Sequence, residues 1–279
     1  ETVAARGVEF DDEPHVIHSP DDYELWMSFF KDPSGNTLAI MDERGGVRRA
    51  VMTGEHPSQR VAITMCHGID TESAETPLSP EHFDALVREA ADLGFASIDY
   101  DRLEAWRLGR EQIPERAILF DFDHPDHSMR HGVHDILARH GYRGNLFINT
   151  GWFDPEHDSH GQCMSWDEVR ELVDLGWHIG AHTVTHPNLS ELTADDPDGS
   201  KLAWELETCD VTLNRELGIV PKDFAFIGTS WSSEAERQVS GRYRFGRLWF
   251  VGTHYQADGE EVRLADLLLS LIHISEHTR

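Results

Sequence analysis

The chain has little positive charge. Only three lysines occur among its 24 Lys and Arg residues, against 51 Asp and Glu, so the formal net charge is -27. Such a surface repels phosphate groups, which excludes nucleic acid and anionic membranes as expected partners. A soluble, acidic surface biased towards arginine is the plain interpretation, and a salt-adapted source is the alternative.

Cysteine and long apolar runs are also scarce. The three cysteines, Cys66, Cys163 and Cys209, are scattered and lack CxxC spacing, so neither a disulfide framework nor a thiolate metal site is expected. No apolar run approaches the roughly 20 residues needed to span a bilayer. The polar opening ETVAARGVEF has no features of a signal peptide. We therefore expect a cytoplasmic protein, or a chain whose native N-terminus is missing.

What the sequence does contain, from residue 61 onward, is an alternation of short apolar runs and amphipathic stretches. Helix signals separate them, such as Ser79 before one apolar face, a capping box at Ser165 and Glu168, and stops at Gly94 and Gly218. The expected strands are 61–65, 95–98, 117–120, 145–149, 178–181, 224–227 and 248–251. About seven such repeats predict an α/β fold with a parallel sheet, and we expect it to close into a barrel. Active sites in such barrels lie at the carboxyl ends of the strands.

One expected strand runs into a cluster of charged and imidazole side chains. Residues 117–120 are apolar and are followed by Asp121, Phe122, Asp123 and His124. Two carboxylates this close repel each other and resist burial. A bound cation would offset that cost, although a DxD pair at a strand end can also cap the helix that follows.

A histidine pair follows another expected strand. His182 and His186 have i, i+4 spacing, which on a helical turn lets two imidazoles meet one ion. Thr183 stands where an HExxH metalloprotease needs glutamate, which argues against that mechanism. Two histidines and one carboxylate suit Zn²⁺ or another divalent metal. Either Asp121 or Asp123 can supply the carboxylate, and the other is then free to act as a general base.

A further set of histidines has spacings of 3, 4 and 3 residues: His124, His127, His131 and His134. This spacing places them on one face of a helix, where a solvated polar stripe is the ordinary interpretation. Of the four, only His124 is near enough to Asp123 in sequence to touch the proposed site.

The segment from about residue 61 to residue 248 resembles the polysaccharide deacetylases, the NodB-homology group or carbohydrate esterase family four. The resemblance rests on ITMCHGI, ILFDFDHP, NLFINTGWF and MSWDEVRELVDLGWHIGAHTVTHPNLSEL, in that order. The His-Thr-Val-Thr-His-Pro core is its most specific part. The resemblance implies a distorted (β/α)₇ barrel, here truncated at its C-terminus.

The same resemblance implies the chemistry. Asp121 takes the place of the catalytic base, and Asp123, His182 and His186 take the places of the metal ligands, with Zn²⁺ expected and Co²⁺, Ni²⁺ or Mn²⁺ as alternatives. The implied reaction is metal-assisted hydrolysis of an amide in an N-acetylated saccharide. The DxD spacing, with Phe122 between the aspartates, occurs in family branches that include enzymes acting on non-sugar amides. Hydrolysis of a small linear or cyclic non-sugar amide is therefore one alternative. A non-catalytic carbohydrate-binding barrel is the other.

The chain departs from the family pattern in two places. The segment FAFIGTSWSS lacks the usual proline, so the backbone of Gly228 or Thr229 is the candidate oxyanion donor. Trp231, Thr229 and His67 are candidate substrate-binding residues, with packing as the alternative role of Trp231. The late histidine of the family has no clear counterpart, and His254 is a candidate general acid by location alone.

The two ends of the chain do not follow the barrel pattern. Residues 25–43 are typical of a hairpin around the turn DPSGN, and they resemble the closing hairpin of a glyoxalase/bleomycin-resistance module. The last residues, SLIHISEHTR, resemble a cloning-derived tail. We therefore expect a glyoxalase-like remnant at 1–43, a linker at 44–60, the barrel at 61–266 and a non-native tail at 267–279.

Overall fold

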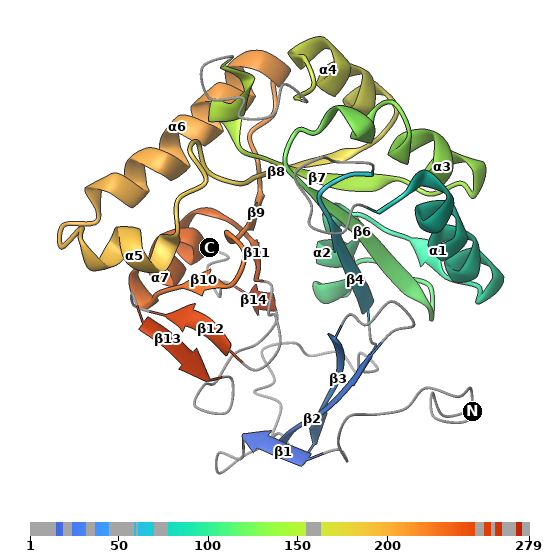
Figure 1. Ribbon diagram of the computed structural model, residues 1–279, viewed down its shortest axis with the longest axis horizontal. Coiled ribbons are helices and arrows are strands. Elements are labelled where there is room, and N and C mark those ends of the chain that lie inside the picture. The colour runs from blue at the N-terminus through green and yellow to red at the C-terminus, as the bar shows by residue number, and fades with distance from the viewer. Residues whose placement is uncertain are drawn as a thin grey trace.

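Figure 1 shows the computed structural model, which describes residues 59, 61–69, 78–154 and 163–248 and six separate strand segments. Those segments are β1 (His15–His18), β2 (Glu24–Lys31), β3 (Thr37–Arg44), β12 (His254–Ala257), β13 (Glu260–Arg263) and β14 (Ile272–Ile274). Strands β1, β2 and β3 form an antiparallel sheet, in which β2 and β3 pair from Lys31 with Thr37 to Glu24 with Arg44. This pairing confirms the expected hairpin.

The main sheet has eight strands, of which seven run in the order β14-β11-β9-β8-β7-β6-β4 while β5 pairs with β6. Its parallel strands are β4 (Val61–Cys66), β5 (Ala96–Ser97), β6 (Ala117–Asp123), β7 (Gly144–Ile148), β8 (His178–Ala181), β9 (Asp223–Ala225) and β11 (Phe245–Arg247). The sheet curls with helices around its outside (Figure 1). Within the described segments no ladder joins β4 to the opposite edge. The fold is a curled half-barrel of the expected α/β type.

The helices begin and end where their capping residues predict. Ser79 accepts a hydrogen bond from His82 N at the start of α1 (Pro80–Asp92), and Ser165 and Glu168 form the capping box of α4 (Trp166–Asp174). Helix α6 (Ser200–Leu217) ends at Gly218, whose φ of 69° suits glycine. The other helices are α2 (Tyr100–Arg107), α3 (Val133–Arg139), α5 (Leu189–Ala194) and α7 (Ser233–Arg242), with 3₁₀ turns η2 (His127–Met129) and η3 (Thr150–Phe153).

Strand β6 has two buried faces. Ile118, Phe120 and Phe122 belong to the outer cluster, which packs the sheet against α1, α3, α4 and α6. Ala117 and Leu119 belong to the inner cluster, which also contains side chains from α2, β7, β9 and β11. Since side chains alternate along a strand, Asp121 and Asp123 continue the inner face. Both aspartates are therefore directed into the curl of the sheet, at its carboxyl end.

One local expectation was wrong. Strand β6 runs through Asp123, because its ladder continues to Cys66 of β4 and to Phe147 of β7, so the two aspartates lie within the strand. The last parallel strand described in the main sheet, β11, ends at Arg247. The expected strand at 248–251 lies largely outside the described residues, so it stays a prediction.

The four clustered histidines do not share one helical face. His124 follows β6, His127 lies in η2, and His134 lies in α3, where its Nδ1 accepts a hydrogen bond from Trp177 Nε1 at 3.0 Å. The chain turns between these elements, so regular helical spacing is lost. In the part of the chain that is described, no helix has the length and apolar character of a membrane span.

Candidate active site

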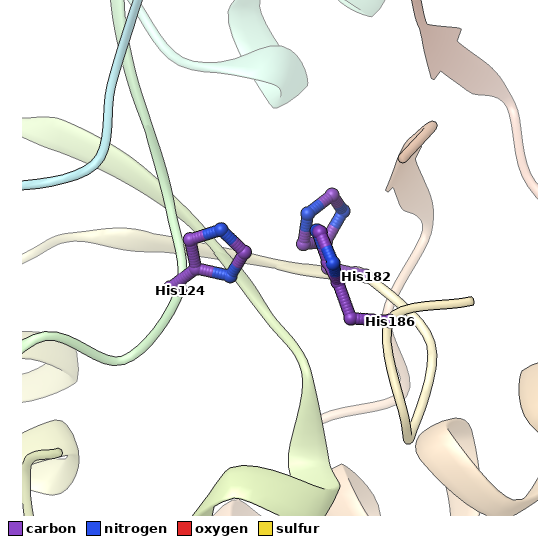
Figure 2. A group of neighbouring side chains, drawn as sticks. All are labelled: His124, His182 and His186. Carbon is purple, nitrogen blue, oxygen red and sulfur yellow. The ribbon is translucent and has the colours of Figure 1, made fainter. Parts of the chain in front are cut away.

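Three imidazoles converge at the carboxyl end of the sheet. His124 follows β6, whereas His182 and His186 follow β8, and one ring nitrogen from each lies within 4.8 Å of the others (Figure 2). His124 and His182 are buried, and His186 is half-buried. The carboxyl ends of β6 and β8 therefore lie close together, as expected. His124, which follows the aspartates of β6, joins the two histidines that follow β8.

His182 has the bonding expected of a metal ligand. Its Nδ1 lies 2.8 Å from the carbonyl oxygen of Ala225, to which it donates, so Nε2 carries the lone pair. That Nε2 is buried and has no hydrogen-bond partner among the described residues. Burial, opposed by Asp123, lowers the pKa of His182 well below its usual value, which keeps the ring neutral. A buried lone pair without a donor is what a metal ion would satisfy.

His124 is held in a comparable way. Its Nδ1 lies 3.0 Å from Asn149 Oδ1, and its ring stacks on Trp152 with centroids 4.4 Å apart. Burial and the nearby His186 lower the pKa of His124 to about 3. Burial likewise lowers the pKa of His186 to about 4. All three rings are therefore neutral and able to coordinate a metal at pH 7.

The backbone at these positions is unusual. Among the described non-glycine residues, only His124, Thr183 and His186 have positive φ, at 72°, 71° and 61°. A left-handed backbone at a residue with a side chain is uncommon, and such strain concentrates at functional sites. Two of the three strained residues are members of the imidazole group, which gives His124 an independent mark of function.

The His182–His186 segment is a loop and not the helical turn that the spacing suggested. Glu205 of α6 braces it: the buried carboxylate accepts hydrogen bonds from Val184 N at 2.8 Å and Thr185 N at 2.9 Å. The hydroxyl of Thr183 accepts a further bond from His186 N at 3.1 Å. These contacts hold the left-handed conformation that brings His186 back beside His182.

Asp123 lies next to the imidazole group. One carboxylate oxygen, Oδ1, pairs with Arg247 Nη2, and the other, Oδ2, lies 4.0 Å from His182 Nε2. Burial alone would raise the pKa of Asp123, but Arg247 and His182 outweigh it and hold the pKa at about 2. The side chain is therefore an ionised carboxylate with one oxygen directed towards the histidines.

Asp121 lies deeper on the same strand, and both of its oxygens are occupied. Tyr100 donates its hydroxyl to Oδ2 at 2.6 Å, Asn145 donates its amide to Oδ1 at 3.0 Å, and Arg247 Nε lies 3.2 Å from Oδ2. Burial raises the pKa of Asp121 to about 6, against the opposing effect of Arg247 and these hydrogen bonds. Asp121 is thus tied into the inner face of the sheet rather than directed at the imidazoles.

The predicted substrate-binding residues lie in different surroundings. His67 is exposed and stacks on His124 with centroids 5.0 Å apart. Thr229 lies in the turn between β9 and β10 (Ser230–Trp231), and Trp231 packs half-buried against the outer cluster. His254 begins β12, which pairs with β10 by way of Gln256 and Ala257, but its side chain lies outside the described residues.

Sequence reasoning missed several residues that shape the site. Arg247 comes from a short strand with little sequence signal, and it lies just before the expected strand at 248–251 rather than at the carboxyl end of one. Asn145 and Asn149 are the first and last residues of an expected strand, and each contacts a candidate residue. Tyr100 is the first residue of α2 and follows the N-cap residue Asp99. It is buried against Asp121 because α2 packs inside the curled sheet.

Comparison with known proteins agrees with this architecture. The family model described as Polysaccharide deacetylase matches residues 110–239, whereas no curated protein matches. Among solved structures, the Streptococcus pyogenes deacetylase PplD in complex with acetate is 16% identical, with a TM-score of 0.57, covering 66% of this chain and 80% of that one.

Two further solved structures have the same fold. A de-N-acetylase from Aggregatibacter actinomycetemcomitans is 16% identical, with a TM-score of 0.60 and coverage of 67% and 87% of the two chains. IcaB from Ammonifex degensii is 19% identical, with a TM-score of 0.58 and coverage of 67% and 82%. The family match supports a polysaccharide deacetylase domain and an enzyme of that kind, and the solved structures show that the fold is shared. They give no support to the glyoxalase-like remnant predicted for the N-terminal residues.

Proposed function

We propose that this protein is a metal-dependent hydrolase that removes acetyl groups from an N-acetylated saccharide by hydrolysing the amide bond. The observation that carries the proposal is the convergence of three neutral imidazoles beside an ionised aspartate at the carboxyl end of the sheet. The family match over residues 110–239 supports the reaction class. The deacetylase folds are consistent with it.

His124, His182 and His186 are the proposed metal ligands. Three protein ligands with room for further ones are typical of catalytic zinc sites, and imidazole nitrogens suit Zn²⁺, Co²⁺ and Ni²⁺. A divalent ion held there would supply a Lewis acid that polarises the amide carbonyl and makes water more acidic. This set differs from the sequence interpretation, in which Asp123 was the third ligand and His124 only a neighbour.

Asp123 is the proposed general base. A base must first be within reach of the reacting groups, and its pKa matters second. The Oδ2 atom of Asp123 faces the imidazole group, whereas the oxygens of Asp121 are occupied by Tyr100 and Asn145. The geometry therefore favours Asp123, and not Asp121, as the general base. It likewise favours His124, and not Asp123, as the third metal ligand.

Arg247 and Asp121 are proposed to position this base. Arg247 is fully buried between the two aspartates, and its pairing with Oδ1 fixes the Asp123 carboxylate while leaving Oδ2 free to accept a proton. Asp121 holds the other side of the guanidinium, with Tyr100 and Asn145 fixing its own orientation. Such a chain of buried, paired charges keeps the base in one rotamer.

Aromatic and polar groups beside the histidines fit a sugar substrate. Trp152 is half-buried and stacks on His124, and His67 is exposed beside the same ring. Flat aromatic faces of this kind can pack against a sugar ring while polar groups orient it. The Gly228 or Thr229 backbone remains the proposed oxyanion donor, Trp231 a further proposed pocket residue, and His254 the proposed general acid.

The proposal is tested by acetate release. The purified chain is stripped of metal, loaded with Zn²⁺, Co²⁺, Ni²⁺ or Mn²⁺ in parallel, and assayed on N-acetylglucosamine oligomers and on a panel of linear and cyclic amides. Release of acetate from the oligomers, abolished by chelator and restored by metal, is the expected result. Turnover of small amides alone would favour the non-sugar hydrolase. Metal binding without turnover on either panel would favour a carbohydrate-binding barrel.

A further inference from the structure

A second group of metal-ligating side chains lies away from the proposed active site. His127 and His131 come from the segment after β6, and Glu168 comes from the first turn of α4. His131 Nε2 lies 2.6 Å from Glu168 Oε1, and His127 Nδ1 lies 3.2 Å from the same oxygen. The two imidazole rings are stacked with centroids 4.2 Å apart. One ligand atom from each residue lies within 4.8 Å of the others.

The carboxylate of this group is fixed before any ligand arrives. Glu168 Oε2 accepts hydrogen bonds from Ser165 N at 2.7 Å and Ser165 Oγ at 2.8 Å. That arrangement leaves Oε1 directed at the two imidazoles. A carboxylate that is oriented by neighbouring donors loses less rotamer freedom when it binds an ion.

The two ligand-bearing segments are also joined by their backbones. Met164 N donates to Pro125 O at 2.7 Å, and Asp126 and Cys163 form an isolated bridge just before η2 and α4. Met129 of η2 is fully buried. His131 N approaches His127 O at 3.3 Å, which completes a turn with i, i+4 spacing between the two rings. The ligands therefore stand on a braced corner of the fold.

We propose that His127, His131 and Glu168 bind a divalent transition-metal ion at a second site. Two imidazoles and one carboxylate favour Zn²⁺, Ni²⁺ or Cu²⁺ over Mg²⁺ and Ca²⁺, which prefer all-oxygen ligands. Both histidines are exposed, so water can complete the coordination sphere. Ligands of a tetrahedral zinc ion lie about 3.3 Å apart, since each Zn–N distance is about 2.0–2.1 Å, and exposed side chains can close to that spacing. The ion would cross-link η2 to α4.

Zinc stoichiometry tests this site separately from the active site. The stripped full-length chain is dialysed against micromolar free Zn²⁺, and bound zinc is measured per chain for the wild type, His131→Ala, His127→Ala and His186→Ala. His82→Ala is the matched control, because His82 is an exposed histidine on α1 outside both groups. Thermal unfolding of each variant checks that the fold is retained.

We expect two zinc ions in the wild type and in His82→Ala, and one in each of the other three variants. The double variant His131→Ala, His186→Ala should bind none. If the wild type binds a single ion that His131→Ala removes, this site stands and the proposed active-site metal fails. If His131→Ala and His127→Ala bind as much zinc as the wild type, the group only joins η2 to α4 and the second site is overturned.

Discussion

An arginine in contact with aspartate lies at each end of β11: Arg244, which is half-buried, comes just before the strand, and Arg247, which is buried, is its last residue. Only the network around Arg244 is fully paired. At the amino end, Arg244 donates to Asp223 at 2.9 and 2.8 Å and to Glu104 at 2.8 Å, and His178 Nε2 lies 2.8 Å from Asp223. At the carboxyl end, Arg247 Nη1 and His182 Nε2 are buried without a hydrogen-bond partner among the described residues. The same residue types thus occur in a saturated and an unsaturated network.

The contrast separates a structural role from a functional one. A buried network with all its charges paired stabilises one conformation and leaves nothing for a ligand to satisfy. A buried network in which a donor and an acceptor are left unpaired, beside strained backbone, indicates that a bound group completes it. We therefore expect substitutions at the amino end to change stability, and substitutions at the carboxyl end to change metal binding and catalysis.

The largest effect is expected from the pair His182→Ala and His178→Ala. His182→Ala removes a proposed ligand and should abolish both zinc binding at the active site and acetate release. His178→Ala removes a hydrogen-bond partner of Asp223 and should leave both properties intact. Zinc per chain and kcat measure the difference. Equal loss in the two variants would remove the distinction between the two ends.

Substitution of the two site aspartates should give the next largest effect. Asp123→Asn should lower kcat by about 10²–10⁴-fold, as expected for loss of a general base, while zinc is retained. Asp121→Asn should cost much less, because Asp121 acts only through Arg247. A larger loss of kcat in Asp121→Asn, or loss of zinc in Asp123→Asn, would restore the roles that the sequence interpretation gave these residues.

Substitution of Arg247 should destabilise the protein more than substitution of Arg244. Arg247→Met leaves Asp121 and Asp123 buried without their shared cation, which should lower the free energy of unfolding by about 3–5 kcal/mol. Arg244→Met should cost less, because Asp223 keeps His178 as a partner. Urea unfolding measures both. Only Arg247→Met should also lower kcat at temperatures where both variants are folded, and a normal kcat there would contradict a positioning role.

A smaller effect is expected from the brace of the histidine loop. Glu205→Ala removes the acceptor of the Val184 and Thr185 amides and should weaken zinc affinity by about 10–100-fold, the usual range for groups that orient ligands. Glu207→Ala, an exposed position on the same helix, is the control. Zinc affinity is measured by competition with a chelator. Equal zinc affinities for Glu205→Ala and Glu207→Ala would contradict the proposed brace.

The smallest effect is expected in the pH profile. Because the pKa of Asp121 is raised to about 6, its carboxylate is charged above that pH and becomes protonated below it. Protonation removes one of the two negative charges beside Arg247, so kcat/KM should fall a few-fold as the pH drops through 6. Asp121→Asn should flatten this limb. If kcat/KM of Asp121→Asn still falls as the pH drops through 6, the titrating group is not Asp121.

Much of the fold could be predicted because its signals are local. Ser79, the Ser165–Glu168 capping box and Gly218 each define a helix boundary through bonds to neighbouring residues, and the structure has those boundaries. The alternation of apolar runs was enough to predict the parallel sheet. The end of β6 was misjudged because its extension depends on ladders with β4 and β7, which are distant in sequence.

The site was predictable only in part, because its geometry depends on contacts between distant strands. The histidine pair after β8 and the aspartates of β6 could be linked, since parallel strand ends meet at one edge. The position of His124 depends on its positive φ and on Asn149, which the spacing of histidines does not encode. The pairing with Arg247 leaves one oxygen of Asp123 directed at the histidines. Arg247 lies 124 residues from Asp123 in the chain, so local sequence does not indicate this contact.

The most direct test is an anomalous diffraction map of the zinc-loaded crystal, recorded above and below the zinc edge. We predict a peak within bonding distance of nitrogens from His124, His182 and His186, with the Asp123 carboxylate beside it and paired with Arg247. A peak bonded to Asp123, His182 and His186 with the His124 ring turned away would contradict the ligand set. The absence of any peak at the carboxyl end of the sheet would contradict the metal site itself.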